Sequence, residues 1–79
     1  MQIEINLFAS LAAYKPKGHG VGGWNAEFSD GLTVGDILAQ LSVPPDKVKI
    51  IFVNGVHADR AAVLNDGDRV GVFPPVGGG

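Results

Sequence analysis

The residues of this chain that could do chemistry fall into three groups. The chain has two histidines, His19 and His57, a glycine-rich hexapeptide at residues 18–23, and three glycines at residues 77–79. Imidazoles suggest a metal site or a general base, and a glycine-rich loop suggests phosphate binding. Glycines at a chain end suggest a slender tail that enters another protein. The residues around each group decide which of these chemistries is feasible.

The two histidines lack the neighbours that a metal site or a catalytic base requires. A zinc site needs three or four ligands at suitable spacing, and His19 and His57 are far apart in a chain without cysteine. Asp59 lies close to His57, but no serine or cysteine nucleophile motif surrounds the pair. Asp66 and Asp68 flank a glycine, where aspartate favours a turn rather than paired acid–base catalysis. We therefore predict no metal site and interpret His57 as an exposed hairpin residue.

The hexapeptide from Gly18 to Gly23 matches the GxGxxG spacing of dinucleotide-binding loops. Such a loop binds pyrophosphate because it leads from a strand into the first turn of a helix. Here residues 24–28 alternate apolar and polar side chains, which predicts a strand instead. Trp24 and Asn25 also stand where a P-loop needs lysine and serine or threonine. We predict a flexible loop between two strands and no bound cofactor.

The segment 73–79 reads FPPVGGG and combines three physical properties. Pro74 and Pro75 end the ladder of a strand and favour an extended polyproline II conformation. The glycines lack a Cβ, so they can enter a channel too narrow for any other residue. Residues 74–79 reach roughly 20 Å when fully extended. The residues alone leave two interpretations open, a functional tail or a frayed terminus.

Composition argues against several classes of protein. A chain of 79 residues allows one domain and buries only roughly 60% of its surface, which is little for a supported catalytic cleft. The lack of cysteine excludes a disulfide framework, a zinc-thiolate site and a thiol nucleophile. A net charge of −2 argues against a nucleic-acid partner, and the short apolar runs argue against a membrane span. The first residues lack the basic start and apolar core of a secretory signal, so we expect a cytoplasmic location.

One helix is predicted at residues 33–41. Its apolar positions recur at i, i+3, i+4 and i+7 and form one stripe, which consists of Val34, Ile37, Leu38 and Leu41. Thr33 and Asp36 resemble a capping box at its start. Gly35 weakens the helix by about 1 kcal/mol relative to alanine, so packing must hold it in place.

Alternating or β-branched segments predict a mixed sheet of four to five strands. These segments are residues 2–8, 24–28, 48–53, 56–58 and 69–73. Asn54 and Gly55 predict a hairpin, because both central residues of that turn need a positive φ. A short helical turn is predicted at residues 9–14.

One helix on one face of a mixed sheet indicates the α+β class, and the ubiquitin-like β-grasp is the simplest small fold that fits. Residues 1–73 would form the domain and residues 74–79 a flexible tail. The sheet side of the core is predicted to consist of Ile3, Ile5, Val48, Ile50, Phe52, Val70 and Val72. The face of the third long strand stays open to a shift by one residue.

Several motifs together resemble the small sulfur carriers of the MoaD/ThiS family, which includes the small subunit of molybdopterin synthase and the carrier of thiamin synthesis. The motifs are Leu7-Phe8-Ala9, Thr33-Val34, Val53-Asn54-Gly55, LNDGDRV at residues 64–70 and FPPVGGG at residues 73–79. Each motif alone would be weak. The combination of L-x-D-G-D-x-V, F-P-P-V and a terminal diglycine in a chain of this length is specific.

The resemblance implies chemistry that is performed on the protein, which would have no catalytic residue of its own. In this family an E1-like activating enzyme uses ATP to adenylate the C-terminal carboxylate, here that of Gly79, and a sulfur donor converts the adenylate to a thiocarboxylate. Gly77 and Gly78 would form the slender tail before it. The residues that the resemblance assigns to partner binding are Phe8, Phe73, Pro74, Pro75 and Val76.

The identity of the partner depends on the branch of the family. The two prolines at residues 74 and 75 favour the molybdopterin or tungstopterin branch, because tails of the thiamin branch usually lack them. The expected acceptor is then the large subunit of molybdopterin synthase or another sulfur-accepting enzyme. Gly77 and His57 depart from the usual pattern, and two alternatives stay open: a carrier for thiamin thiazole, or a ubiquitin-like modifier that is conjugated through Gly79. We expect Gly78 and Gly79 to be disordered in the free protein.

Overall fold

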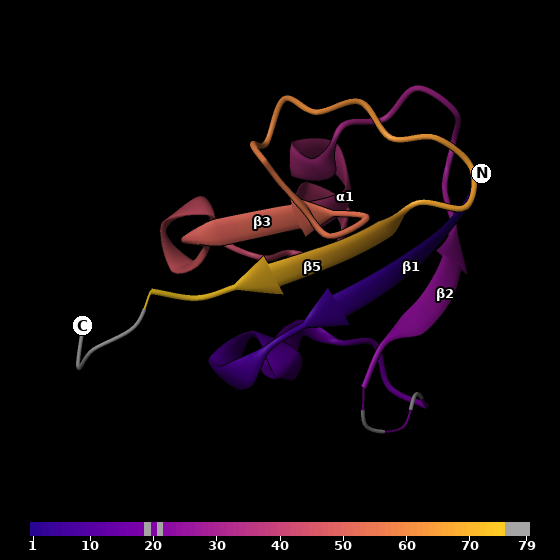
Figure 1. The fold of residues 1–79 in the computed structure, drawn as a ribbon. Helices are drawn as coiled ribbons and strands as arrows, with labels where there is room; N and C mark the ends of the chain where they lie inside the picture. Colours follow the sequence, from indigo (N-terminus) through magenta and orange to yellow (C-terminus); the bar gives the residue numbers. More distant parts are fainter. Residues whose placement is uncertain (19, 21, 76–79) are drawn as a thin grey trace.

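A five-stranded mixed sheet with one main helix on one face forms the fold, which confirms the predicted α+β class (Figure 1). The computed structural model describes residues 1–18, 20 and 22–75. The strands are β1 (Gln2–Leu7), β2 (Trp24–Glu27), β3 (Ile50–Val53), β4 (Val56–Ala58) and β5 (Arg69–Phe73). The helix is α1 (Val34–Gln40), and two 3₁₀ helices are η1 (Ala9–Tyr14) and η2 (Pro45–Lys47). Within the described ranges, no helix is long and apolar enough to cross a membrane.

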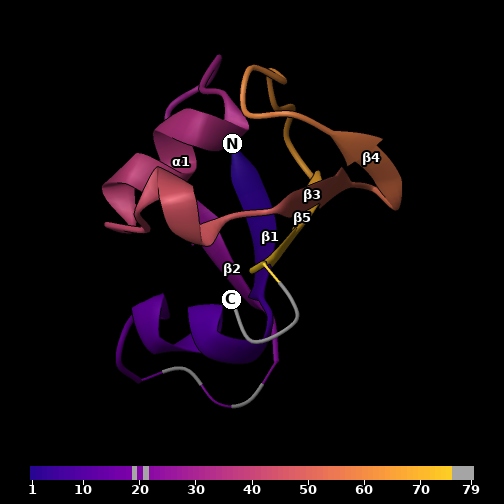
Figure 2. The same cartoon turned by 90° about the vertical axis from the view of Figure 1, so that its left-hand side faces the viewer.

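The first and last strands lie side by side in the middle of the sheet. The strand order is β2-β1-β5-β3-β4, and β1 pairs with β5 in parallel whereas the other pairs are antiparallel. Figure 2 shows α1 on one side of the sheet, with no helix of the described chain covering the strands on the other side. This second side is called the open face below. Because strands alternate their side chains, residues that the helix does not cover must face solvent or a partner there.

The predicted capping box is present at the start of α1. The backbone N–H of Asp36 donates to the Thr33 hydroxyl at 3.1 Å, and the backbone N–H of Thr33 donates to the Asp36 carboxylate at 2.9 Å. The hydrogen bond from the Thr33 backbone, and after it the one from the Thr33 side chain, lower the pKa of Asp36 below its ordinary value. The helix itself is slightly shorter than predicted, because Thr33 and Leu41 are its caps.

The lowered pKa of Asp36 predicts a pH dependence of stability. The stabilising effect of the charged carboxylate is fully present above the unfolded pKa of about 3.9, and it is lost as the pH falls through the lower, folded pKa. Asp36→Asn should therefore flatten the acid limb of the stability curve, measured by thermal unfolding at neutral pH and below about pH 4. Thr33→Ala should lower the free energy of unfolding by about 1 kcal/mol at neutral pH. An Asp36→Asn variant with the acid dependence of the wild type would contradict this account.

The core lies between α1 and the sheet. Most of the predicted core residues are buried, and these are Ile3, Ile5, Val34, Ile37, Leu38, Val70 and Val72. Leu41 and Val48, also predicted, are only partly buried and pack against the edge of the core. Further buried residues are Leu7 at the end of β1, Trp24 at the start of β2, and Leu11, Val43 and Leu64 from the segments between strands.

The predicted face of β3 is wrong by one residue. Ile51, and not Ile50 or Phe52, is the residue of this strand that is buried in the core. The register explains the difference, since Ile51 lies opposite Val72 and Phe52 lies opposite Gly71. Directly opposed residues share a face, so the buried Val72 fixes Ile51 inside and leaves Phe52 on the open face.

Two turns form as their sequences predict. Asn54 and Gly55 adopt φ values of 53° and 79°, which is the backbone that the hairpin between β3 and β4 requires. At the second turn, Asp68 accepts hydrogen bonds from the Asn65 N–H and from the Asn54 side chain, at 2.8 and 2.9 Å. Asp66 accepts the Gln2 N–H at 2.6 Å. Both aspartates therefore serve as hydrogen-bond acceptors, and they connect the turn before β5 to Gln2 of β1 and to the turn after β3.

Candidate functional site

Phe8 and Phe73 form the centre of the candidate site. Their rings stack on the open face with centroids 4.3 Å apart and an interplanar angle of 6°. Phe8 follows β1 and Phe73 is the last residue of β5, so the parallel pairing of these strands brings the two rings to the same end of the sheet. The Phe8 N–H continues this pairing by donating to the Val72 carbonyl at 3.0 Å. Two residues predicted to bind a partner are thus in direct contact.

The backbone of Phe73 is fixed on the side of β3. Phe73 lies opposite Ile50, and the Lys49 N–H donates to the Phe73 carbonyl at 2.8 Å. The strand ends here because Pro74 and Pro75 follow, and proline has no N–H for the ladder. Pro74 is half-buried and Pro75 is exposed. Phe73 is therefore the last residue that the sheet holds before the tail begins.

Two further aromatic residues extend this pair, and the sequence did not assign either of them to the site. The Phe52 ring meets Phe73 edge to face, with centroids 5.9 Å apart, and His57 meets Phe52 in the same way at 5.8 Å. Edge-to-face contacts of this kind are favourable because the positive ring edge meets the negative ring face. We call Phe8, Phe73, Phe52 and His57 the aromatic cluster. His57 is exposed, as predicted.

A hollow of about 310 Å³ opens beside the aromatic cluster. Its floor includes Gly71, whose missing side chain leaves room for the Phe8 ring: a Cβ there would lie 3.4 Å from Phe8 Cε2. Its rim is polar and includes Glu4 and Arg69, whose charged atoms lie 3.7 Å apart. An apolar floor with a polar rim is the usual composition of a surface that binds another protein.

The other predicted site residues are only partly within the described chain. Val76, Gly77, Gly78 and Gly79 lie outside the described residues, and so do the predicted disorder of the last two glycines and the position of His19. In the glycine-rich segment, the described residues are followed by β2 and not by a helix. The Lys15 ammonium binds the carbonyls of Gly20 and Gly22. The strand that follows, β2, was predicted from the sequence, and it stands where a dinucleotide-binding loop would lead into a helix.

Comparison with known proteins decides the family. The model of the ThiS family matches residues 5–79. The chain belongs to the ThiS family. This confirms the resemblance that the motifs indicated, and the β-grasp domain with its aromatic cluster is a ThiS-family domain.

Similar proteins include two from the archaeon Haloferax volcanii. Small archaeal modifier protein 3 is 35% identical over 96 aligned positions that cover the whole of both chains. The crystal structure of small archaeal modifier protein 1 has a TM-score of 0.70 at 27% identity, covering 95% of this chain and 98% of the other. A putative molybdopterin converting factor subunit 1 from Pyrococcus furiosus has a TM-score of 0.71 at 27% identity, with the same coverage. This ThiS-family chain is thus similar both to protein modifiers and to a protein named for pterin chemistry.

Proposed function

We propose that this chain is a sulfur carrier whose C-terminal glycine, Gly79, is activated by an ATP-dependent, E1-like enzyme. The carboxylate is a poor acyl donor, and its adenylate has AMP as a good leaving group. A donor that delivers sulfide-level sulfur then attacks the carbonyl carbon, the C–O bond to AMP breaks, and the new C–S bond gives the thiocarboxylate. The sulfur is transferred from there to an acceptor enzyme. The chain is the substrate of this chemistry: its domain binds the partner enzymes, and its extended tail carries the carboxylate into their active sites.

The observation that carries this proposal is the position of the aromatic cluster relative to the tail. Phe73 is both the last residue of the sheet and the centre of the cluster, since it contacts Phe8 on one side and Phe52 on the other. A partner that covers the cluster thus lies at the base of residues 74–79, which reach roughly 20 Å when extended. We assign partner binding to Phe8, Phe73, Pro74, Pro75 and Val76, and the slender insertable end to Gly77, Gly78 and Gly79.

Molybdopterin or tungstopterin synthesis is the pathway that we propose for the sulfur. The FPPV sequence at residues 73–76 favours it, and the Pyrococcus furiosus structure named as a molybdopterin converting factor subunit supports it. The acceptor would then be the large subunit of a molybdopterin synthase. Transfer of sulfur to thiamin thiazole, and not to a precursor pterin, in a reconstituted reaction would contradict this assignment.

A second candidate function is conjugation to other proteins. The whole-chain match to small archaeal modifier protein 3 favours it. Both functions begin with the same adenylate at Gly79, and they differ in the nucleophile that attacks next: a sulfur donor, or a lysine amine of a target protein. Mass spectrometry of the chain purified from its own cells separates them. A carrier gains the mass difference between sulfur and oxygen, whereas a modifier appears in adducts of high mass that are linked through Gly79.

Phe73→Ala should weaken binding of the activating enzyme by about 2 kcal/mol, which is roughly 30-fold in Kd, because central aromatic residues dominate the free energy of protein interfaces. The substitution also removes the Phe8 stack, so the free energy of unfolding should fall by about 1 kcal/mol. Isothermal titration calorimetry and thermal unfolding measure the two effects separately.

Val63→Ala is the matched control for Phe73→Ala. Val63 is an apolar residue with 61% exposure that lies outside the aromatic cluster, so its loss should leave the Kd within about twofold. Equal affinities of Phe73→Ala and wild type would refute the assignment of the cluster to partner binding.

A further inference from the structure

Arg60 is held in an unusual position next to α1. The backbone N–H of Gly35 donates to the Arg60 carbonyl at 2.9 Å, and a Cβ on Gly35 would lie 3.2 Å from that oxygen and 3.4 Å from the Arg60 Cβ. Glycine in the first turn of α1 is unfavourable for the helix, and this close approach explains why it is there. The absence of a side chain at residue 35 therefore lets Arg60 lie against the helix.

The guanidinium of Arg60 is not fully hydrogen-bonded. Its Nη1 atom is buried and has no partner in the part of the chain that the structure describes. The ion pairs among these residues join the N-terminal amine to Asp30, and Arg69 to Glu4, so Arg60 has no carboxylate partner. A buried donor without an acceptor is costly. Nη1 itself is out of reach of a partner, but Arg60 as a whole is only partly buried and lines a hollow, so an acceptor from outside the chain would bind at the accessible part of the guanidinium.

Arg60 lines a second hollow of about 230 Å³, together with Lys49 and His57. We call this hollow the basic pocket. Asp59 also lines it, but one of its carboxylate oxygens already accepts the Ala61 N–H at 2.8 Å. The lining thus includes two basic residues, Lys49 and Arg60, and one carboxylate that already accepts a hydrogen bond. The pocket is thus locally basic, although the chain as a whole has a net charge of −2.

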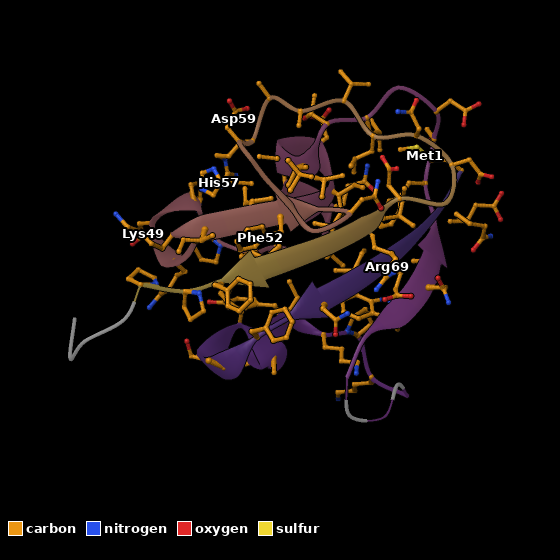
Figure 3. The ribbon with its side chains drawn as sticks, viewed as in Figure 1. Met1, Lys49, Phe52, His57, Asp59 and Arg69 are labelled. Atoms are coloured by element: carbon orange, nitrogen blue, oxygen red, sulfur yellow. The ribbon has the colours of Figure 1, made fainter. Side chains whose placement is uncertain are left out.

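The basic pocket lies on the helix side of β3 and β4, since Ile51 also lines it, and it meets the aromatic cluster at the edge strand β4. His57 belongs to both, since it lines the pocket and contacts Phe52. Lys49 also joins them, because its N–H binds the Phe73 carbonyl. Figure 3 shows Lys49, His57 and Asp59 toward this end, and Arg69 toward the other. A partner that covers the aromatic cluster would therefore have to extend around the edge strand β4 to contact the basic pocket.

We infer that the basic pocket binds an aspartate or glutamate side chain of the activating enzyme. This inference rests on the proposed function and extends it by naming the chemistry of a second contact. The carboxylate would accept hydrogen bonds from Arg60 and Lys49, which is the charge-assisted pairing for which a guanidinium is suited. The phosphate of the adenylate is a poor candidate, because an extended tail carries it roughly 20 Å from Phe73.

The test measures adenylation kinetics with the activating enzyme of the same organism. Arg60→Gln and Lys49→Gln should each raise the KM for the carrier about tenfold at low salt and leave kcat unchanged. Each substitution removes a charged contact with the enzyme, but both positions lie far from the reacting carboxylate. Arg60→Lys should restore part of the affinity. Lys17→Gln removes one charge from an exposed residue in the segment before β2 and should leave KM within about twofold.

Each outcome decides a different claim. If Lys49→Gln and Lys17→Gln have the same KM, the basic pocket does not bind the enzyme and the inference is wrong. Lys49 is exposed, so its substitution should not affect folding and the comparison reports on binding. If millimolar inorganic phosphate shifts the His57 NMR signals and competes with the enzyme, the pocket is a site for small anions instead. If the wild-type chain is adenylated but the Arg60 and Lys49 variants match it, the proposed function stands and this inference falls. A wild-type chain that is not adenylated overturns both.

Discussion

Deletion of Gly79 should reduce adenylation to below about 1% of the wild-type rate and leave the unfolding temperature unchanged. The deletion moves the carboxylate back along the tail by about 3.3–3.6 Å, and a misplacement of only about 1 Å can reduce a rate 100-fold. The described chain buries its hydrophobic residues between Ile3 and Val72, so the core should not change. Release of pyrophosphate from ATP measures the first effect, and thermal unfolding the second.

Gly78→Val tests the requirement for a slender tail without a change in its length. A β-branched residue should block a channel that is shaped for glycine, and adenylation should fall to a similar degree. Gly20→Val is the matched control, because the position of its Cβ has no other atom within 4 Å and its φ is not in the left-handed region. That variant should be adenylated at the wild-type rate. Normal adenylation and sulfur transfer by the Gly79 deletion would refute the carrier function, and the end of the chain would then have no chemical role.

The sequence predicted the fold wherever one periodicity dominated. In β1 the strict alternation of Ile3 and Ile5 with polar residues leaves one possible buried face, and both are fully buried. In α1 the stripe around Leu38 and the capping box of Thr33 define the helix to within one residue at each end. These signals are local, so they survive in a single sequence.

Local signals do not determine the face of β3. Residues 50–53 are all apolar, so alternation is absent and either face would satisfy the hydrophobic pattern. The pairing with β5 determines which face of β3 is buried, because it places Ile51 opposite Val72. The same pairing moves Phe52 into the aromatic cluster, where the sequence had not placed it.

The candidate site was predictable only through the family resemblance. The motifs assigned Phe8 and Phe73 to the site, but the stack between them depends on the parallel pairing of strands at opposite ends of the chain. The basic pocket gave no sequence signal, since Lys49 and Arg60 belong to different segments and neither forms a charge run. Gly35 was the one visible anomaly, and its explanation required the position of Arg60.

Leu38→Ala should destabilise the protein by about 2–5 kcal/mol, which is the second large effect that we expect. Leu38 is fully buried in the centre of the apolar stripe of α1, so the truncation removes its transfer free energy and leaves a cavity. At about 0.05–0.15 kcal/mol per residue, the whole chain is stable by only roughly 4–12 kcal/mol. The loss is therefore a large fraction of the total, and urea denaturation should show a much lower midpoint with an unchanged slope.

Leu41→Ala is the control that locates this effect in the core. Leu41 has the same side chain, but it is the C-cap residue of α1 and only partly buried, so its truncation should cost less than half as much. The comparison uses one chemical change at two depths, so the effect of the substitution on the unfolded chain is similar in both variants. If the two variants lost equal stability, Leu38 would not be the centre of the helix–sheet interface.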